Sequence, residues 1–355
     1  MSEYNPSIVK IERIENHPNA DNLCIYYVLG DYPVIGKIGE YKINDLAAYI
    51  PVDAIVPDTG KFYFLCPKSD GKPKYQLGSV PEKYRIIKAK KLRGIYSEGL
   101  LVSAPEGMNL GDSIIERLQI KKWEEDEEDN LKYSSDGIFA MNTKGGNAEK
   151  PPQHFSIPYY DIEGLRKHSS LLNTDEHFVV MEKIHGSNAS YCYDGDRLWV
   201  KSRRFFKQKD ENDMWWDIAF RYQLEDKLSK YPMYVFFGEI YGQINKFRYD
   251  CVVESGKLKT KIRFFDIYDA KSHLFLNYDK FKEIITELGL DSAPEMYIGP
   301  WLGKDDMYKL AEGISNIGSN IKEGFVIKPI TNRFEKYLNG RMILKHISEA
   351  YKLQK

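Results

Sequence analysis

Glu182-Lys183-Ile184-His185-Gly186-Ser187-Asn188 follows an apolar, β-branched run, residues 178–181, that predicts a buried strand. A lysine on such a strand is a candidate nucleophile, because burial and neighbouring cations lower an amine pKa from its usual value of about 10.4. Gly186 would allow a tight turn beside a ligand, and Asn188 supplies a donor and acceptors. Taken alone, the pattern also fits a solvated lysine at a sheet edge.

Length and composition limit the classes of protein to consider. The 355 residues fit two domains, and 42% hydrophobic and 14% aromatic residues suffice for sizeable cores. Because the net charge is −1, the chain is no globally basic nucleic-acid-binding protein, and phosphate binding must come from local patches.

The four cysteines stand far apart in the sequence and form no C-x-x-C pair, so neither a zinc site nor a disulfide framework is indicated. No run of about 18 apolar residues predicts a transmembrane helix, and the N-terminus lacks the form of a signal peptide. We therefore expect a protein of the cytoplasm or another reducing compartment, with no membrane partner.

Residues 1–120 show short strands separated by turns, at residues 7–14, 23–29, 46–50 and 98–102, which suggests a small barrel. Two phrases, at residues 17–23 and 90–99, resemble phrases of OB-type barrels that bind tRNA or belong to RNA-processing enzymes. The second phrase concentrates positive charge suited to phosphates, on Lys90, Lys91 and Arg93 beside Lys88. A strand edge guarded by lysines is the alternative interpretation.

Residues 121–155 are expected to form a linker, because the acidic block at residues 124–129 repels itself. From residue 156 to residue 355, strands alternate with helices expected at residues 161–172, 213–230 and 278–288. Strands are expected at residues 198–201, 233–241, 261–268, 324–328 and 342–346. This order predicts an α+β domain.

Five clusters downstream of Lys183 each place charge inside or beside an apolar strand. They lie at residues 201–204, 236–242, 263–268, 323–329 and 341–346. A buried charge is costly unless it is paired or bound to a ligand. One such insertion is commonly a structural ion pair, but five of them, with two Glu and several cations, indicate one pocket for a polyanion and a metal.

In this order the clusters resemble the covalent nucleotidyltransferase superfamily of polynucleotide ligases and capping enzymes. Within it, K-x-H-G-x-N in place of the commoner K-x-D-G resembles the ATP-dependent RNA ligases, and the preceding barrel resembles their branch with an N-terminal OB domain. The resemblance covers nearly the whole chain except the linker. It implies an OB-type β-barrel followed by an α+β, ATP-grasp-like nucleotidyltransferase domain.

The resemblance also implies an activity. Lys183 would attack the α-phosphate of ATP, release pyrophosphate and carry AMP, which would pass to an RNA 5′-phosphate before a 3′-hydroxyl seals the strand. ATP and a divalent metal, Mg or Mn, would be the cofactors. The partner would be RNA with 3′-hydroxyl and 5′-phosphate ends, in a nicked duplex, and we expect a monomer.

Roles for single residues follow from the same resemblance. Glu182 and Ile184 would flank the adenine, Phe265 would stack on it, and Glu239 would accept a hydrogen bond from the ribose. Glu323 would hold the metal, while Lys345 and Lys328 would steady the α-phosphate. The remaining contacts would come from Asn188 and Arg203 on the RNA phosphate or adenylate, Arg166 on the pyrophosphate, and Lys90, Lys91 and Arg93 on RNA. Phe265 could equally be core, and Glu239 a buried ion pair.

Two departures from the family pattern leave alternatives open. The last motif usually carries two lysines as K-x-K, but here isoleucines stand two residues from Lys345 on both sides, so His346 or Arg341 substitutes or one contact is missing. Arg203 and Arg204 are two candidates for one role. The competing functions are a DNA ligase or capping enzyme with the same lysine chemistry, and a catalytically inactive RNA-binding protein.

Overall fold

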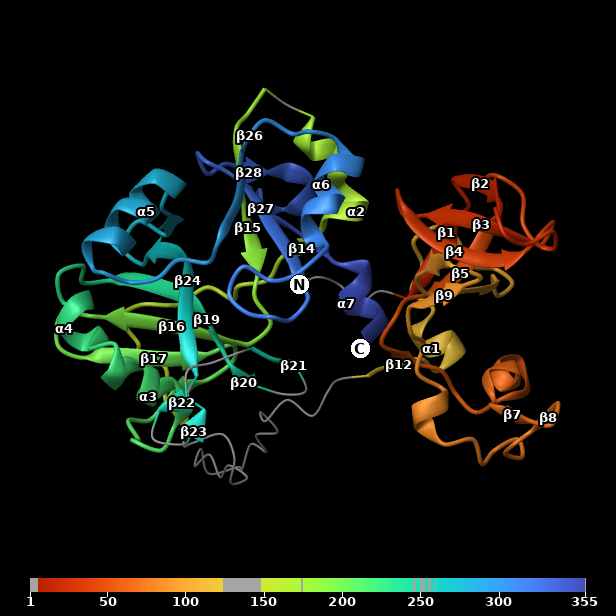
Figure 1. Cartoon of the computed structure of the whole chain (residues 1–355), viewed down its shortest axis with the longest axis horizontal. Coiled ribbons are helices and arrows are strands. Elements are labelled where there is room, and N and C mark those ends of the chain that lie inside the picture. The colour runs from red at the N-terminus through yellow and green to blue at the C-terminus, as the bar shows by residue number, and fades with distance from the viewer. Residues whose placement is uncertain are drawn as a thin grey trace. The chain divides into compact units, whose positions relative to one another are not determined.

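The computed structural model describes residues 6–123, 148–173, 175–244, 247–249, 253–254, 257–258 and 260–354. The chain forms two compact units (Figure 1). The N-terminal unit comprises residues 2–125 together with residues 164–169 and 349–355. The C-terminal unit comprises residues 126–163 and 170–348. The acidic block at residues 124–129 and Cys251 lie outside the described residues.

The N-terminal unit contains two three-stranded antiparallel sheets. One has the order β1 (Ser7–Lys10), β5 (Leu46–Ile50), β11 (Leu100–Ser103), and the other the order β2 (Arg13–Asn16), β3 (Leu23–Val28), β4 (Tyr32–Lys37). Shorter elements complete it: pairs β6 (Ala54–Ile55) with β12 (Lys121–Lys122), β7 (Lys68–Ser69) with β8 (Lys72–Pro73), and β9 (Lys90–Leu92) with β10 (Ile95–Ser97), and helices η1 (Gly60–Leu65), η2 (Glu82–Tyr84) and α1 (Ile115–Leu118). β-Branched and aromatic residues of these strands fill the core, as β propensity predicts.

Two segments from far along the sequence pack with this unit, α2 (Leu165–His168) and α7 (Glu349–Gln354). The buried Arg166 guanidinium donates to the Asp31 carbonyl at 3.1 Å and to Glu349 at 2.9 Å. Lys352 donates to the buried carboxylate of Glu98. From the sequence, both segments were expected in the C-terminal domain, because no local pattern reveals these long-range pairs.

The C-terminal unit is built on a seven-stranded antiparallel sheet and a five-stranded sheet. The seven-stranded sheet has the order β13 (Ala148–Glu149), β18 (Phe206–Lys207), β17 (Leu198–Ser202), β16 (Ser187–Tyr193), β19 (Tyr234–Tyr241), β24 (Lys261–Asp269), β25 (Leu274–Phe275). The five-stranded sheet has the order β14 (Glu163–Gly164), β30 (Leu344–Ile347), β27 (Gly324–Pro329), β15 (Phe178–Lys183), β26 (Glu295–Gly299). Short pairs and a turn add β20 (Gln243–Ile244) with β21 (Phe247–Arg248), β22 (Val253–Glu254) with β23 (Lys257–Leu258), β28 (Phe334–Glu335) with β29 (Gly340–Arg341), and η4 (Lys336–Leu338).

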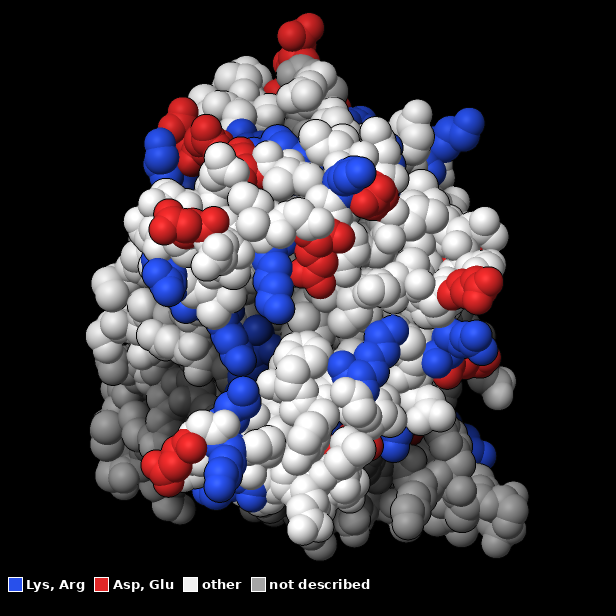
Figure 2. Space-filling model, turned by 90° about the vertical axis from the view of Figure 1, so that its right-hand side faces the viewer, with Lys and Arg blue, Asp and Glu red and all other residues white. Residues whose placement is uncertain are grey.

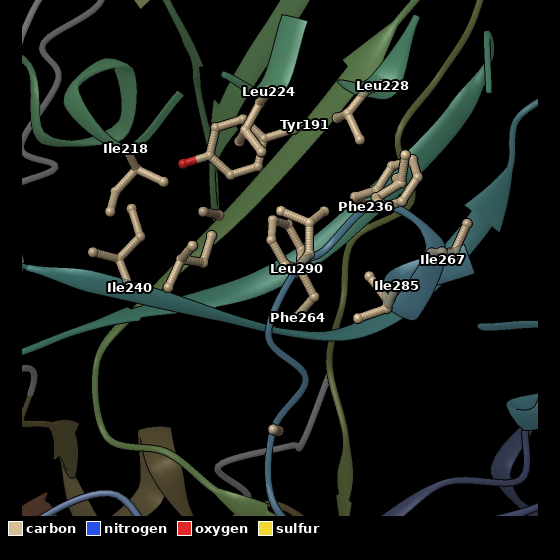
Figure 3. Close-up of a cluster of buried hydrophobic side chains, with 14 of the residues drawn as sticks. Tyr191, Ile218, Leu224, Leu228, Phe236, Ile240, Phe264, Ile267, Ile285 and Leu290 are labelled. Atoms are coloured by element: carbon tan, nitrogen blue, oxygen red, sulfur yellow. The ribbon is translucent and has the colours of Figure 1, made fainter. Parts of the chain in front are cut away.

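Helices cover these sheets and bury the main core (Figures 1 and 3). Helices α3 (Met214–Arg221), α4 (Leu224–Leu228) and α5 (Tyr278–Glu287) contact the seven-stranded sheet, and α6 (Lys304–Ala311) contacts β27 and β30. Figure 3 shows apolar side chains of α3, α4, α5, β16, β19 and β24 meeting in one cluster, in agreement with their burial. This core fixes the strands that carry the candidate site.

Two expected helices differ in the structure. The helix expected at residues 213–230 divides into α3 and α4, because Gln223 adopts a left-handed conformation with φ 53°. Residues 161–172, expected as one helix, form β14, α2 and the 3-10 helix η3 (Ser169–Leu172). At the ends of the expected linker, β12 and β13 pair with β6 and β18. Among the described residues, no helix is both long and apolar enough to cross a membrane.

Candidate active site

The five-stranded sheet presents two lysines on one face. Lys183 ends β15 and pairs with Gly324, and Lys345 of β30 pairs with Val326. Since Val326 also pairs with Met181, two residues before Lys183, the two lysines point to the same side of the sheet. The predicted nucleophile and the predicted phosphate contact therefore lie on one surface.

Glu323 reaches this surface from the residue that precedes β27. Gly324 has φ 151°, and a Cβ there would lie 1.9 Å from the His346 carbonyl oxygen, so only glycine permits this approach of the strands. Glu323 Oε1 accepts a hydrogen bond from Lys183 Nζ at 2.6 Å. Its Oε2 is buried without a hydrogen-bond partner among the described residues.

The seven-stranded sheet supplies the opposite side of the site. Asn188 of β16 and Glu239 of β19 are direct partners in register. At Gly186, between β15 and β16, a Cβ would lie 2.1 Å from the Ile240 carbonyl oxygen, so this glycine admits the close approach of β19. Burial, with Glu323 adding to it, raises the pKa of Glu239 to about 8, although Lys183 and Arg203 oppose the shift.

The charge state of Lys183 differs from the expectation. Burial lowers its pKa, as does Arg203, but Glu323 and Glu239 outweigh them and raise the pKa above its usual value. The sequence pattern indicates burial and neighbouring cations, but it cannot place two distant carboxylates beside this amine. Without a ligand, Lys183 is a protonated ammonium.

Lys345 and Arg203 are the other cations of the site. Burial and the Lys183 charge lower the pKa of Lys345 to about 8, although Asp161 and Glu323 oppose this. Arg203 follows β17, and its guanidinium lies 3.9 Å from Asp161. Of the two arginines, Arg203 has the charge that acts on Lys183, Glu239 and Lys345, whereas Arg204 is exposed.

Glu182 and His346 point away from this surface. Both pair with Phe325, so they share the opposite face of the sheet. The Glu182 carboxylate accepts hydrogen bonds from the Ser315 hydroxyl, the Asn316 N–H at 2.8 Å and the Asn316 amide at 2.7 Å. His346 stacks on Tyr308 with 3.9 Å between ring centroids. The orientation of His346 disfavours it as a replacement for the missing lysine. The Glu182 side chain holds the loop of Ser315 and Asn316, and its place beside the adenine stays a prediction.

Lys328 and Arg341 belong to a buried ion network. Both bind the fully buried Asp266, Lys328 at 3.0 Å, and Tyr160 donates to the same carboxylate at 2.7 Å. Lys328 Nζ also donates to the Phe265 carbonyl at 3.0 Å. Because Asp266 engages both cations, the phosphate role of Lys328 and the replacement role considered for Arg341 stay predictions that this ion network disfavours.

Three other predicted residues have clear positions. Ile184 is buried in the main core. Phe265 is half-buried and packs edge-on against Tyr160 at 5.0 Å, so stacking on adenine stays a prediction for it. Arg166 lies in the N-terminal unit with Asp31 and Glu349 as partners.

The two phrases of the N-terminal unit contact each other. His17 Nδ1 accepts the Asn19 N–H at 3.1 Å, so the proton on Nε2 is donated to the Leu92 carbonyl, also at 3.1 Å. Asn19 donates to the Arg93 carbonyl at 2.9 Å. These bonds fix the turn after β9, and Lys88, Lys90, Lys91 and Arg93 are all exposed. Figure 2 shows basic side chains in a broken row on the face that it presents.

Glu323 fits a divalent metal. Among the residues that the structure describes, no group of three or more His, Cys, Asp or Glu side chains could hold a metal alone. A catalytic Mg²⁺ is usually held by one or two carboxylates together with substrate phosphates and water. The buried, unpartnered Oε2 of Glu323 matches that kind of site, in which substrate completes the coordination.

Comparison with known proteins connects this geometry to a family. Residues 176–347, which carry every residue of the site from Lys183 to Lys345, match the RNA ligase family model. These residues, just under half of the chain, are therefore similar to an RNA ligase domain. Residues 6–104 match a model described as an OB-fold domain. These matches confirm the predicted fold class and the predicted resemblance to RNA ligases with an N-terminal OB-fold domain.

Solved structures show the same architecture. A Naegleria gruberi RNA ligase with pyrophosphate has a TM-score of 0.76 to this chain at 20% identity, covering 98% of both chains. A glutamate-to-alanine variant of that ligase with AMP and Mn has a TM-score of 0.77 at 20% identity, covering 99% of both chains. At this identity the likeness establishes the fold. The comparison with curated proteins gives no match.

Two residues that support the site, Tyr249 and Asp161, were not expected from the sequence. Tyr249 accepts a hydrogen bond from the His185 N–H at 3.0 Å and so supports the turn after Lys183. Asp161 was expected only as the first residue of a helix, yet it lies beside Arg203. A polar residue among aromatics, as in Tyr159-Tyr160-Asp161, is the signal that could have pointed to it.

Proposed function

We propose that this chain is an ATP-dependent RNA ligase that works through a Lys183–AMP intermediate. The contact between Lys183 Nζ and Glu323 Oε1 carries the proposal, because it places an amine against a buried carboxylate that keeps a second oxygen available. Lys345 on the same face and Glu239 opposite complete a site for a phosphate ester. The RNA ligase family supports this assignment.

The first step forms a bond between Lys183 Nζ and the α-phosphorus of ATP and breaks the bond from that phosphorus to the bridging oxygen. Pyrophosphate leaves with the bond electrons. Lys183 must lose a proton, and Glu323 Oε1 at 2.6 Å is the acceptor in contact with it. AMP then passes to the RNA 5′-phosphate, which frees the lysine. A 3′-hydroxyl displaces AMP and forms the phosphodiester.

Positive charge on the chain stabilises the charge that develops on the phosphate. Lys345 and Arg203 can face the phosphoryl oxygens, and donors fixed before reaction cost little reorganisation. Asn188, directly opposite Glu239, can contact the RNA phosphate or the adenylate. We assign Glu239 to the ribose, where its raised pKa favours a hydrogen-bonding carboxyl over a costly bare charge.

ATP and a divalent metal, Mg or Mn, are the proposed cofactors. Glu323 would hold the metal, which would neutralise phosphate charge and polarise the phosphoryl oxygens. The Naegleria gruberi ligase has been solved as a lysine-to-alanine variant with ATP and Mn. The proposed substrate is RNA with 3′-hydroxyl and 5′-phosphate ends in a nicked duplex, bound by a monomer in a reducing compartment such as the cytoplasm.

The intact mass of the full-length protein, before and after incubation with ATP and Mn²⁺ or Mg²⁺, tests the proposal. We expect a gain of one AMP with ATP and none with GTP. Lys183→Ala should remove the gain, whereas Lys280→Ala, which changes an exposed lysine of the same domain, should retain it. An adduct with GTP would indicate a capping-type enzyme, and no adduct with either nucleotide would indicate an inactive RNA-binding protein.

Nucleic-acid substrates separate the two ligase classes. Sealing of a nick with a ribose 3′ end, and not of an all-DNA nick, is the expected result. Equal sealing of both nicks would contradict RNA specificity and favour the DNA ligase alternative.

A further inference from the structure

Tyr160 anchors a short segment, Tyr159-Tyr160-Asp161, beside the cations of the candidate active site. Its hydroxyl donates to Asp266 at 2.7 Å, and its ring centroid lies 5.0 Å from those of Phe237 and Phe265. Asp266 is fully buried and is also bound by two cations. The backbone of this segment is therefore fixed from the interior of the domain.

Both neighbours of Tyr160 reach Arg203. The Arg203 guanidinium lies 5.3 Å from the Tyr159 ring and 3.9 Å from Asp161 Oδ1. Asp161 Oδ1 also accepts the Ile162 N–H at 3.0 Å, which fixes the carboxylate. The Arg203 side chain is 41% exposed, so these two contacts limit a side chain that would otherwise sample many rotamers.

The distance between Asp161 and Arg203 suits a positioning role. At 3.9 Å the carboxylate attracts the guanidinium without a hydrogen bond, which requires about 3.2 Å or less. The guanidinium N–H groups therefore keep the fork geometry with which arginine binds a phosphate through two parallel bonds. A closer, bidentate pair with Asp161 would instead have occupied those donors.

The backbone of Arg203 is fixed independently. Buried Lys201 donates to the Arg203 carbonyl at 2.9 Å and to the Ser202 carbonyl at 3.3 Å. The Ser202 hydroxyl accepts the Phe205 N–H at 3.2 Å, which closes the turn. With its main chain held by this turn, Arg203 needs only a side-chain partner to have one orientation.

We propose that Asp161, supported by Tyr159, is a positioning residue that holds the Arg203 guanidinium ready for the phosphate that reacts in adenylyl transfer. Asp161 acts chiefly through Arg203, with a weaker effect of its charge on Lys345, and does not itself touch the substrate. Arg203 thereby supplies, from the seven-stranded sheet, the second cation that the strand of Lys345 lacks. The inference rests on the proposed function, because it deepens the role of the same site.

A double-mutant cycle on the rate of Lys183–AMP formation in the full-length protein tests this inference, with ATP, Mn²⁺ and intact mass as the readout. Asp161→Asn, Arg203→Ala and the double variant are compared with wild type. Asp217→Asn is the matched control, because it breaks an Asp–Arg pair of α3 outside the site. Thermal unfolding of each variant reports on structure.

We expect Asp161→Asn to lower the rate at saturating ATP roughly 10-fold, with a smaller change in the KM for ATP. The reason is that a misplaced Arg203 loses its contact with the phosphate chiefly in the transition state. Arg203→Ala should lower the rate at least as much, and Asp161→Asn should add little in that background. The control should retain the wild-type rate.

Additive losses in the double variant, or an unchanged rate for Asp161→Asn, would overturn the inference. The proposed function would still stand in that case, provided that the wild-type protein forms the adduct. If wild type forms no adduct, the proposed function itself fails. Should Asp161→Asn unfold, Tyr159→Leu replaces it, because Tyr159 is 48% exposed. That change should slow wild type and leave the Arg203→Ala rate unaltered, and equal slowing of both would overturn the inference.

Discussion

At the scale of single residues, the site holds Lys183, the proposed nucleophile, in its unreactive charge state. Glu323 and Glu239 raise the Lys183 pKa, so the ligand-free amine is protonated and paired at 2.6 Å. Such pairing lowers the energetic penalty of a buried cation before substrate arrives. Reaction then requires that Glu323 give up this contact, which a metal or a transferred proton would achieve.

Glu323→Gln separates the two effects of this carboxylate. The change removes a group that raises the Lys183 pKa, so the amine becomes easier to deprotonate. It also removes the proposed metal ligand and proton acceptor, and we expect that loss to dominate, with adduct formation falling roughly 100-fold or more. Initial rates by intact mass across a Mn²⁺ titration provide the measurement, with Glu283→Gln on α5 as the control. A faster variant would mean that lysine protonation alone limits the reaction.

Lys345 illustrates a conflict between stability and function. Its pKa is about 8 in the folded chain and 10.5 in the unfolded chain, so burial and Lys183 penalise the charged form. Below pH 8 both states are protonated and the full penalty applies. Between pH 8 and 10.5 the folded state binds fewer protons, so the penalty declines as pH rises.

Lys345→Met should therefore stabilise the protein by up to about 3 kcal/mol at pH 7, while abolishing efficient adenylation. The gain should shrink toward zero near pH 10. Denaturant unfolding at pH 7 and pH 10 checks this, with Lys309→Met, an exposed lysine, as the control that shows no such pH dependence. A variant less stable than wild type at pH 7 would contradict the assigned pKa direction.

At the scale of elements, the alternation of side chains along each strand decides which predicted residues lie on the same face of the sheet. Lys183 and Lys345 share a face because both follow the two-residue period of their strands. The same period excludes His346, the direct neighbour of Lys345, and that exclusion was available from the sequence. The buried ion pair of Lys328 with Asp266 could not be predicted from the sequence, because a partner 62 positions away leaves no local pattern.

Helix α7 provides a test of how much a buried ion pair between distant elements contributes to stability. Lys352 donates to Glu98, a carboxylate that is 2% exposed and also accepts from the Tyr96 hydroxyl at 3.1 Å. Lys352→Met leaves that carboxylate buried without its cation, which should cost about 3 kcal/mol of unfolding free energy.

Denaturant unfolding of the full-length chain measures this cost. Lys280→Met on α5 is the matched control, because loss of its exposed pair with Glu283 should leave stability nearly unchanged. Equal effects of the two substitutions would show that α7 contributes no more to the N-terminal unit than a surface pair does.

At the scale of the whole molecule, the order of motifs predicted the class of both domains, whereas contacts between distant segments escaped prediction. Short strands at regular spacing indicated the OB-type barrel, and the match of residues 6–104 to an OB-fold domain model confirms it. The inclusion of α2 and α7 in the N-terminal unit could not be read from sequence. Arg166 illustrates the limit, because its partners Asp31 and Glu349 are 135 and 183 positions away.

The net charge of −1 makes RNA binding depend on local patches, and β9 with its turn is the patch we predict. The triple substitution of Lys90, Lys91 and Arg93 by alanine should weaken RNA binding. It should also reduce the slope of log K against log salt by roughly 2, since each lost phosphate contact removes about 0.7 to 0.9. The matched control replaces three other exposed lysines of the same unit, Lys68, Lys72 and Lys83.

Because both variants lose three positive charges, overall charge cannot explain a difference between them. Binding of a nicked RNA duplex, titrated by fluorescence anisotropy from low to high salt, supplies the slopes, and adduct formation verifies that the ligase domain is intact. The β9 variant should lose affinity while adenylating Lys183 normally. Equal slopes for the two variants would indicate that the exposed lysines of β9 prevent pairing of a strand edge with another chain, the alternative that the sequence left open.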